Sequence, residues 1–506
     1  MNRYILKAAF CAMLAVPALT SCELDQYPEG SIPAEQAWQT VKDAGRFNNG
    51  LLANLRTATE PAYAMIQEAQ SDLFNATTYN GNPPYTQTHS WLFNSDNFDG
   101  NAIWQAQYGL VSTANNILNN IDNIKPLEGA NYEAELALLK KYKAIAYFAR
   151  AYAYTQLVSG YCKNFDPATA DKTLGLPLVT EVDVNAKPSR ASLADTYKFI
   201  MEDLRLAKEN FVDKENTDII EPNYNAALAL EARVALLHHD YQTAINDSKE
   251  LMGKYPLITD ADEFFAMWQS DQGSEAIYVP QQTIDELLGG YSAFINCVDV
   301  AGEGKYTAGY IPSKGLMSLY DEDDIRLSTY FTQTGIYANA EKEDPNGYIL
   351  SKFPGNPDLR KGNAKYEFNN MVKVFRVAEF YLIAAEAQYR LNGEGGEYLN
   401  QLRDARGAKR LGTVDGKPLT GGELFKAIKD EWAREMCGEG QRFMCLKRWN
   451  EGFTRMVPQN LVEGIIYTQN NVNTLTISPD NKRWVWELPS NELLTNKNLE
   501  RNWPEQ

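Results

Sequence analysis

The strongest constraint on the fold is helical hydrophobic periodicity, which is clearest in residues 225–256. This segment, NAALALEARVALLHHDYQTAINDSKELMGKYP, predicts two helices joined by a tight turn at His239. Ala232, Ala244 and Pro256 lie at the spacing of the small residues and the terminal proline of a tetratricopeptide repeat. The aromatic and glycine positions of that repeat are missing, so the pattern predicts a helical hairpin that matches the repeat only in part.

Three further helices are expected before this hairpin. Two cover residues 102–124 and 134–158, and the second ends at the loop sequence SGYCKNFDP. The third follows Ser192, which is the expected N-cap, with Asp195 at the capping-box position where Glu or Gln is usual. Together these helices form the first predicted layer.

A second group of helices is expected towards the C-terminus. It begins with an apolar stripe that Gly393 ends, formed by Val374, Ala378, Tyr381, Leu382 and Ala385. A partner helix and a third helix, which Gly438 stops, follow it. The sequence thus predicts an all-α core divided between residues near 100–256 and 371–450.

Two long segments lack helical periodicity, residues 77–101 and 289–312. Both combine glycine and proline with many aromatic and amide side chains. Loops of this length are uncommon in compact domains and are usually functional or disordered. Their aromatic content argues against disorder, so we expect them to be functional.

The N-terminus has the pattern of an exported lipoprotein. Arg3 and Lys7 precede an apolar run with about half of the roughly 20 residues that a membrane-spanning helix needs. Leu-Thr-Ser-Cys then reads as a bacterial lipobox, which makes residues 1–21 a signal peptide and Cys22 the site that carries acyl chains such as palmitate. Stable anchoring takes more than one chain. A plain signal peptide with an incidental cysteine is the alternative.

Composition excludes some classes of function. The chain has 48 Lys and Arg against 66 Asp and Glu, a formal net charge of −18, and nucleic-acid binding rests on cationic groups. Three histidines leave little for a His-rich metal site. Four scattered cysteines follow Cys22, without a CxxC motif, and free buried thiols are favoured over disulfides: Cys162, Cys297, Cys437 and Cys445.

The search for catalytic motifs yields none. The sequence NSDNFDG at 94–100 alternates oxygen ligands as a calcium loop does, but Phe98 interrupts it, which favours a polar turn and leaves a calcium ion open. The sequence DEDD at 321–324 predicts a solvated acidic helix start. Nothing selects two of the 66 acidic residues as a glycosidase pair. We expect a binding protein with no catalytic residues, cofactor or metal ion.

Seven segments, in order, resemble the SusD/RagB family of outer-membrane lipoproteins of Bacteroidetes. Each is weak alone, but the series covers nearly the whole chain: IWQAQYGLVSTANNILNNID, YKAIAYFARAYAYTQLVSGY, RASLADTYKFIMEDLRLA, RVAEFYLIAAEA, LNQLRDARGA, REMCGEGQRFMCLKRW and WELPSNELLTNKNLERNWP. Within the sixth segment we expect packing and ion-pair roles for the residues that match best, Arg434, Glu435, Glu439, Arg442 and Trp449.

The resemblance implies a helical core of four tetratricopeptide-like pairs with an irregular, loop-rich part that binds the ligand. It implies one SusD-like domain over residues 22–506, with an N-terminal part to about 215 and a RagB/SusD part from about 216. The implied partner is a SusC/RagA-like TonB-dependent transporter of the outer membrane. Glu23 and Asp25 resemble the acidic export signal of surface lipoproteins, which implies a lipid-anchored protein that faces the cell exterior.

The ligand site is expected in the two long loop regions, where members of the family commonly build it. A binder of sugars or peptides needs aromatic faces for stacking and Asn, Asp or Arg for hydrogen bonds. The candidates are Asp72, Tyr79, Asn80, Asn82, Tyr85 and Trp91 from the first region, and Tyr291, Phe294, Asn296, Tyr306 and Tyr310 from the second. The opposing interpretation is that these aromatic rings hold the loops against the core.

The resemblance leaves the ligand class open. The segments SCELD, KYPLI and the closing WELP and NWP look closer to the RagB branch, which implies peptide capture. Most of the family is tied to glycan use, so oligosaccharide is favoured and oligopeptide is the alternative. A lipid-anchored hydrolase and a helical-repeat scaffold without a ligand are two further hypotheses.

Overall fold

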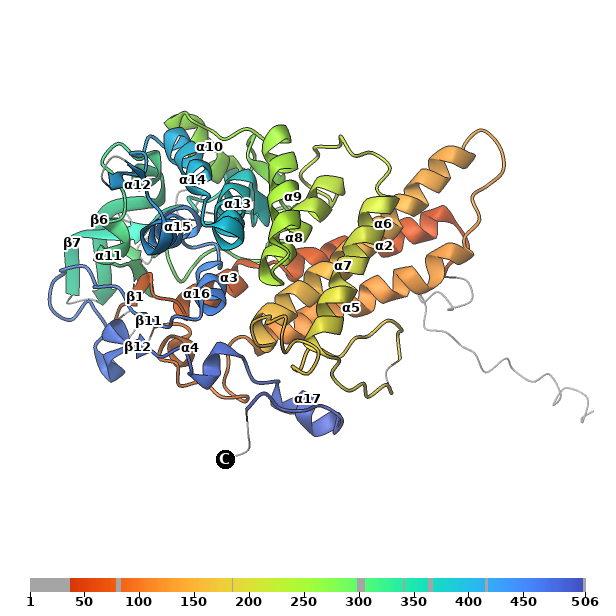
Figure 1. The fold of residues 1–506 in the computed structure, drawn as a ribbon, viewed down its shortest axis with the longest axis horizontal. Coiled ribbons are helices and arrows are strands. Elements are labelled where there is room, and N and C mark those ends of the chain that lie inside the picture. The colour runs from red at the N-terminus through yellow and green to blue at the C-terminus, as the bar shows by residue number, and fades with distance from the viewer. Residues whose placement is uncertain are drawn as a thin grey trace, which may run out of the picture.

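The computed structural model describes residues 37–503, apart from 79–82, 184, 298–304, 340–341, 363–366 and 415–416. The predicted signal peptide and Cys22 therefore lie outside the described residues. The fold is mainly helical, as the sequence predicts, with the four-stranded sheet and several short strand pairs at one end of an elongated molecule (Figure 1). Among the helices of the described ranges, none has both the length and the apolar character to span a bilayer.

The first helical layer lies at the end of the molecule opposite the four-stranded sheet (Figure 1). It consists of α2 (Val41–Thr57), α5 (Asn101–Asn120, extended by the 3-10 turn Ile121–Asn123), α6 (Tyr132–Tyr161) and α7 (Leu193–Asn210), with α6 packed between α5 and α7. The Ser192 hydroxyl accepts the backbone N–H of Asp195 at 3.0 Å, which confirms the predicted N-cap. The three helices expected before the hairpin are thus confirmed, and α6 continues three residues further than predicted.

The helical hairpin is confirmed as α8 (Tyr224–Leu237) and α9 (Tyr241–Lys254), with Ala232 and Ala244 fully buried. The later helix α13 (Val377–Asn392) packs against both, so the two halves of the core form one body. It ends at Gly393, whose φ of +81° is the left-handed conformation that glycine adopts without strain. The later group continues through α14 (Gly396–Ala405), α15 (Gly421–Met436) and α16 (Arg442–Trp449).

Shorter helices complete the helical part of the fold. They are α3 (Pro61–Ala69), α4 (Thr86–His89), α10 (Ala261–Ser270), α11 (Lys314–Met317), α12 (Ile325–Tyr330) and α17 (Ser490–Thr495), with 3-10 turns at Pro357–Leu359, Gln469–Thr474 and Lys482–Trp484. Packing against α16 places α3 at the centre of the molecule.

The strands form several small sheets. The largest has the order β3-β4-β6-β7, with β4 parallel to β6 and the other pairs antiparallel: β3 (Asn296–Cys297), β4 (Tyr306–Thr307), β6 (Phe331–Asn339) and β7 (Lys342–Leu350). The remaining antiparallel pairs are β1 (Phe74–Ala76) with β5 (Tyr310–Pro312), β2 (Ala276–Tyr278) with β8 (Phe375–Arg376), β9 (Thr413–Val414) with β10 (Lys417–Pro418), and β11 (Phe453–Thr454) with β12 (Thr476–Ile477).

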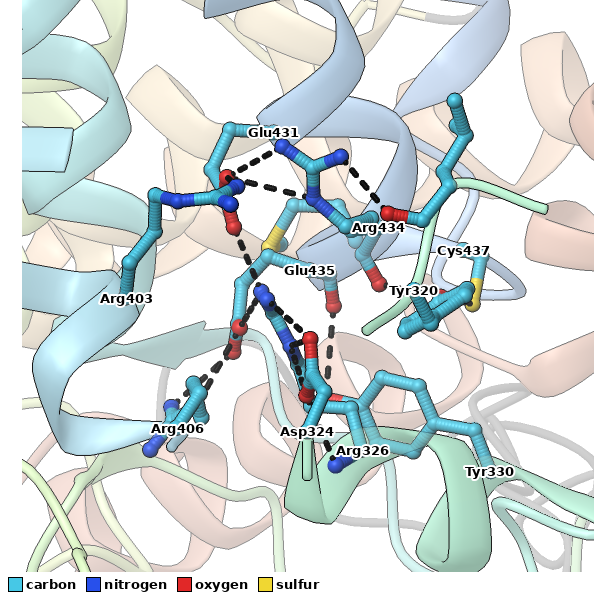
Figure 2. Close-up of polar contacts among 12 residues, drawn as sticks. Tyr320, Asp324, Arg326, Tyr330, Arg403, Arg406, Glu431, Arg434, Glu435 and Cys437 are labelled. Carbon is cyan, nitrogen blue, oxygen red and sulfur yellow. Dashed lines mark hydrogen bonds and ion pairs between the residues drawn. The ribbon is translucent and has the colours of Figure 1, made fainter. Parts of the chain in front are cut away.

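A buried ion-pair network joins α12, α14 and α15 (Figure 2). The guanidinium of Arg326, which is fully buried, donates to Glu431 at 2.7 Å and to Glu435 at 2.9 Å. Burial alone would raise the pKa of Glu435, but Arg406, Arg376 and Arg326 hold it well below its usual value. Since one missing partner leaves a buried charge unpaired, the network fixes the relative positions of these helices.

The expected packing and ion-pair roles within the segment REMCGEGQRFMCLKRW are confirmed. Arg434 pairs with Glu431, Glu439 pairs with Arg376 and Lys352, Arg442 pairs with Asp72, and the indole N–H of Trp449 donates to Glu386. The four cysteines of the predicted mature core are free thiols, and all but the half-buried Cys297 are buried. The prediction of free thiols is thus confirmed, and burial holds for three of the four.

Two predictions concern polar turns, at residues 94–100 and 321–324, and the structure confirms the first and part of the second. The side chain of Asn94 accepts the backbone N–H groups of Asp96 and Asn97, at 2.8 and 3.2 Å, as a polar turn requires. Asp324 does cap α12, accepting the N–H of Arg326, and Glu322 and Asp323 before it are exposed as expected, but for Asp324 itself the expectation of solvation is wrong. It is buried because its carboxylate also pairs with the side chain of Arg326.

Candidate functional site

The structure brings the two long loop regions side by side. Strand β1 pairs with β5 in antiparallel register, Phe74 opposite Pro312 and Ala76 opposite Tyr310. The pairing continues beyond β1, where the backbone N–H of Thr77 donates to the carbonyl of Gly309 at 3.0 Å. Residues of the two loop regions, more than 200 positions apart in the sequence, therefore lie next to each other beside the four-stranded sheet. We call the surface that the described residues of 77–101 and 289–312 form there the loop-bearing face.

The close approach of the two regions depends on Gly309. A Cβ atom at this position would lie 2.5 Å from Cδ of Pro84, closer than side chains tolerate. The hydroxyl of Tyr310 donates to the carbonyl of Pro84, and its ring packs 4.9 Å from that of His89. The glycine thus lets one loop lie against the other, and Tyr310 holds them together.

Four of the predicted site aromatics are buried and pack within the protein. Tyr291 stacks on Phe353 with ring centroids 3.5 Å apart, and Phe294 packs on Phe74 at 4.7 Å. The indole N–H of Trp91 donates to the carbonyl of Gln70 at 3.0 Å. Trp91, Tyr291, Phe294 and Tyr310 are at most 2% exposed, so none presents a ring face to solvent. In the structure these rings hold the loops in place, as the opposing interpretation expects.

Asp72 is also committed to an internal contact. Its carboxylate accepts from Nε and Nη2 of Arg442 at 2.7 and 2.8 Å, and the residue is 5% exposed. A bidentate pair of this kind uses both carboxylate oxygens. Asp72 therefore joins the first loop region to α16 in place of offering a free oxygen to a ligand.

Three predicted residues remain half-buried at the surface of the loop-bearing face. These are Tyr85, Asn296 and Tyr306. Tyr85 has a left-handed backbone with φ of +56°, a conformation uncommon for a residue with a side chain. Burial raises its pKa to about 12, so the phenol stays neutral and can donate a hydrogen bond at physiological pH. Tyr79, Asn80 and Asn82 lie outside the described residues.

The sheet adds surface residues that the sequence reasoning missed. The ammonium of Lys305 lies 4.8 Å above the ring of Tyr337 and 3.5 Å from the carboxylate of Glu343. The next residue along the chain after Lys305, Tyr306, contacts the half-buried ring of Phe368, with ring centroids 6.4 Å apart. The content of β-branched and aromatic residues in FTQTGIYAN was the available signal for the strand that carries Tyr337.

The accessible chemistry of this face is that of recognition. It consists of phenol rings, an amide, one ammonium group and one exposed carboxylate, which suit stacking and hydrogen bonds to a ligand rich in hydroxyl or amide groups. No group of three or more His, Cys, Asp or Glu side chains that could hold a metal ion occurs among the described residues.

Two family models match the chain over most of its length. One, described as the SusD family, matches residues 262–505, and another, described as starch-binding associating with outer membrane, matches residues 46–236. The matches support the family as a whole and do not distinguish its RagB branch. They meet near the helical hairpin of α8 and α9, since one ends at residue 236 and the next begins at residue 262.

Characterised relatives and solved structures agree with this assignment. The chain is similar to the SusD-like protein P2 of Formosa agariphila, with 24% identity over the whole of both chains. It has the fold of a SusD superfamily protein from Bacteroides thetaiotaomicron, at 22% identity and a TM-score of 0.74 over 92% of this chain and 100% of that one. A SusD-like carbohydrate binding protein from Bacteroides vulgatus gives a TM-score of 0.75 at 20% identity, covering 92% of this chain and 99% of that one.

Proposed function

This chain belongs to the SusD/RagB family, and we propose that it is a lipoprotein of the outer membrane that binds oligosaccharides and delivers them to a TonB-dependent transporter of the SusC/RagA kind. The observation that carries the proposal is the union of the two aromatic loop regions into one face. The description of the matched family as starch-binding and outer-membrane-associated, and the carbohydrate-binding neighbour, support it.

We place the oligosaccharide on the half-buried residues of the loop-bearing face. Tyr306 offers a ring beside Phe368, and Asn296 on the adjacent strand offers an amide. Aromatic rings stack on the apolar faces of sugar rings, while amides bond to hydroxyl groups in both directions. Tyr85, and the predicted Tyr79, Asn80 and Asn82, complete the proposed set from the other loop region.

The proposed anchor is separate from the proposed site. Cys22 would carry the acyl chains, and the acidic residues behind it would direct the protein to the cell exterior.

Isothermal titration of the purified protein against neutral oligosaccharides and oligopeptides tests the ligand class. We expect oligosaccharide binding that Tyr306→Ala weakens at least tenfold. Tyr132→Ala is the matched control, because Tyr132 is 40% exposed and begins α6, in the helical layer at the opposite end from the four-stranded sheet. If only the oligopeptides bind, the ligand class is peptide and the proposal of an oligosaccharide ligand is wrong. If oligosaccharide binding is the same in Tyr306→Ala as in wild type, the proposed site is wrong.

The same samples distinguish binding from hydrolysis. After prolonged incubation with a bound oligosaccharide, we expect chromatography to recover the ligand intact. Shortened products that increase with protein concentration would contradict a purely binding role.

A further inference from the structure

A cavity lies within the helical core, apart from the loop-bearing face. It has a volume of about 90 Å³ and lies among α3, α5, α6, α8, α13, α15 and α16, at the middle of the molecule (Figure 1). Each buried water needs about 10 to 15 Å³ of such space, so the cavity has room for about six to nine waters. None of the described residues proposed for the loop-bearing face lines it.

The charged side chains along this cavity are paired with each other or with neighbours. Arg233 forms two hydrogen bonds of 2.8 Å with Glu379, and Arg376 donates to both oxygens of Glu439. Arg448 pairs with Glu386 at 2.7 Å, and Lys373 pairs with Asp271 at 2.8 Å. Within the described residues the cavity therefore offers no unpaired cation to an anionic ligand.

One lining carboxyl, Glu60, makes no ion pair within the described ranges. Burial raises its pKa, and a hydrogen bond with Tyr63 opposes that effect. The Glu60 carboxylate would repel an anionic ligand. A cationic ligand would find at most this one half-buried carboxylate as its counter-ion. The balance of charge favours an uncharged occupant.

The neutral polar groups of the cavity have unused hydrogen-bonding capacity. Nε2 of Gln107 donates to the carbonyl of Ala58 at 2.8 Å, which fixes the amide and leaves Oε1 buried without a partner. Nε1 of Trp432 is likewise buried with no acceptor in the described part of the chain. Gln107 is 0% and Trp432 3% exposed, so both groups lost water on folding. An unsatisfied buried polar group costs about 1 to 3 kcal/mol, which a ligand that bonds to it would recover.

Three more amides line the same cavity, those of Gln67, Gln156 and Gln441. Their side chains make no hydrogen bond to any described residue. The rings of Tyr63 and Tyr152 form part of the wall. An amide can donate and accept at once, so this lining matches hydroxyl groups, which do the same, over an apolar ring face.

We propose that this cavity binds a small neutral polyhydroxylated molecule, of the size of a cyclic polyol or one sugar residue. The indole N–H of Trp432 and the amide oxygen of Gln107 supply its buried donor and acceptor. The proposal does not rest on the oligosaccharide site, because the residues involved are different.

Saturation-transfer NMR with D-glucose, D-galactose and myo-inositol tests the proposal, with acetate and methyl phosphate as charged probes. We expect signals from at least one neutral probe and none from the charged probes. Gln107→Leu keeps roughly the size of the side chain and Trp432→Phe keeps an aromatic ring, and both remove the unpaired group, so each should weaken binding at least tenfold. Tyr306→Ala should leave this binding unchanged, which separates the cavity from the loop-bearing face.

The response of thermal unfolding to the neutral probe gives a second readout. Without sugar both variants should unfold below the wild-type temperature, because Gln107→Leu also removes the hydrogen bond to the carbonyl of Ala58 and Trp432→Phe removes buried ring atoms. Addition of the neutral probe should raise the unfolding temperature of wild type more than that of either variant. If either variant fails to fold, ¹⁵N-Trp-labelled wild-type protein decides, through the shift of an indole resonance on addition of the neutral probe. Absence of binding by all three neutral probes, equal binding of acetate or methyl phosphate, or unchanged binding by both variants would overturn the proposal.

Discussion

Asp72 and Arg442 form a bidentate ion pair, at 2.7 and 2.8 Å, between residues 370 positions apart in the chain. The pair connects the end of the segment that leads into the first loop region with the first residue of α16. Both residues are less than a tenth exposed, so the contact forms away from water. The position of the loop-bearing face is thus tied to the helical core through one buried charge pair.

Asp72→Asn should destabilise the protein strongly. The substitution leaves the guanidinium of Arg442 buried without its counter-ion, which costs about 3 to 5 kcal/mol in comparable buried pairs. Urea unfolding followed by circular dichroism measures the loss. Glu202→Gln is the control, since it breaks an exposed pair with Arg205 and exposed pairs contribute little. Equal stability of Asp72→Asn and wild type would mean that the pair does not hold the two parts together.

Gly309→Ala tests the close approach of the two loop regions. The new methyl group would overlap Cδ of Pro84, so we expect a loss of about 1 to 3 kcal/mol in unfolding free energy and weaker ligand binding at the loop-bearing face. Gly109→Ala is the matched control. It lies in the exposed interior of α5 with no atom within 4 Å of the added Cβ, so it should stabilise the helix by about 0.5 to 1 kcal/mol. Both values come from the same chemical unfolding experiment, and a neutral Gly309→Ala would show that the loops can separate without cost.

The sequence was sufficient for the features that depend on local chemistry. The N-cap at Ser192, the turn between α8 and α9 and the stop at Gly393 each rest on neighbouring residues, and each is confirmed. The pairing of β1 with β5 could not be predicted, because it joins residues far apart through backbone groups that every sequence carries. The two loop regions were nevertheless identified separately by their composition.

The direction of an aromatic side chain in a loop is the property that sequence did not determine. Tyr291 and Tyr306 lie in the same segment and have the same chemistry, yet one stacks on Phe353 in the core and the other reaches the surface. Periodicity gives side-chain direction in a helix or strand, and a loop has none. The β-branched and aromatic residues of FTQTGIYAN were a signal for β6. A register shift between Thr334 and Ile336 breaks its alternation, so the surface position of Tyr337 did not follow from the sequence.

Cys22→Ala should release the protein from the membrane. The thiol is the proposed attachment point of the acyl chains, and without them the protein loses a membrane affinity of about 0.8 kcal/mol per buried methylene. Fractionation of cells followed by immunoblotting should find the variant in the soluble fraction, with its oligosaccharide affinity unchanged. Cys297→Ala, which removes a half-buried thiol within the fold, should stay with the membranes. Retention of Cys22→Ala in the membrane fraction would contradict the lipid anchor.

Glu68 gives the protein a pH-dependent stability. Its carboxyl is fully buried on α3, where it accepts the backbone N–H of Gly440 at 2.9 Å, and burial raises its pKa to about 8. Arg442 and Lys352 oppose the rise, and the nearby Asp72 adds to it. The folded state therefore favours the neutral acid, whereas the unfolded chain ionises near the ordinary value of 4.5.

The sign of the effect follows from this difference. The favourable contribution of neutral Glu68 is complete below pH 4.5 and is lost as the pH rises from there to about 8. Glu68→Gln, which cannot ionise, should therefore gain on wild type across this range, by about 3 to 5 kcal/mol at pH 8 relative to pH 4.5. Urea unfolding at both pH values gives this double difference, and Glu202→Gln, at an exposed position, should show none. If the gap between Glu68→Gln and wild type stays constant, Glu68 is ionised in the folded protein and its neighbours Arg442 and Lys352 outweigh its burial.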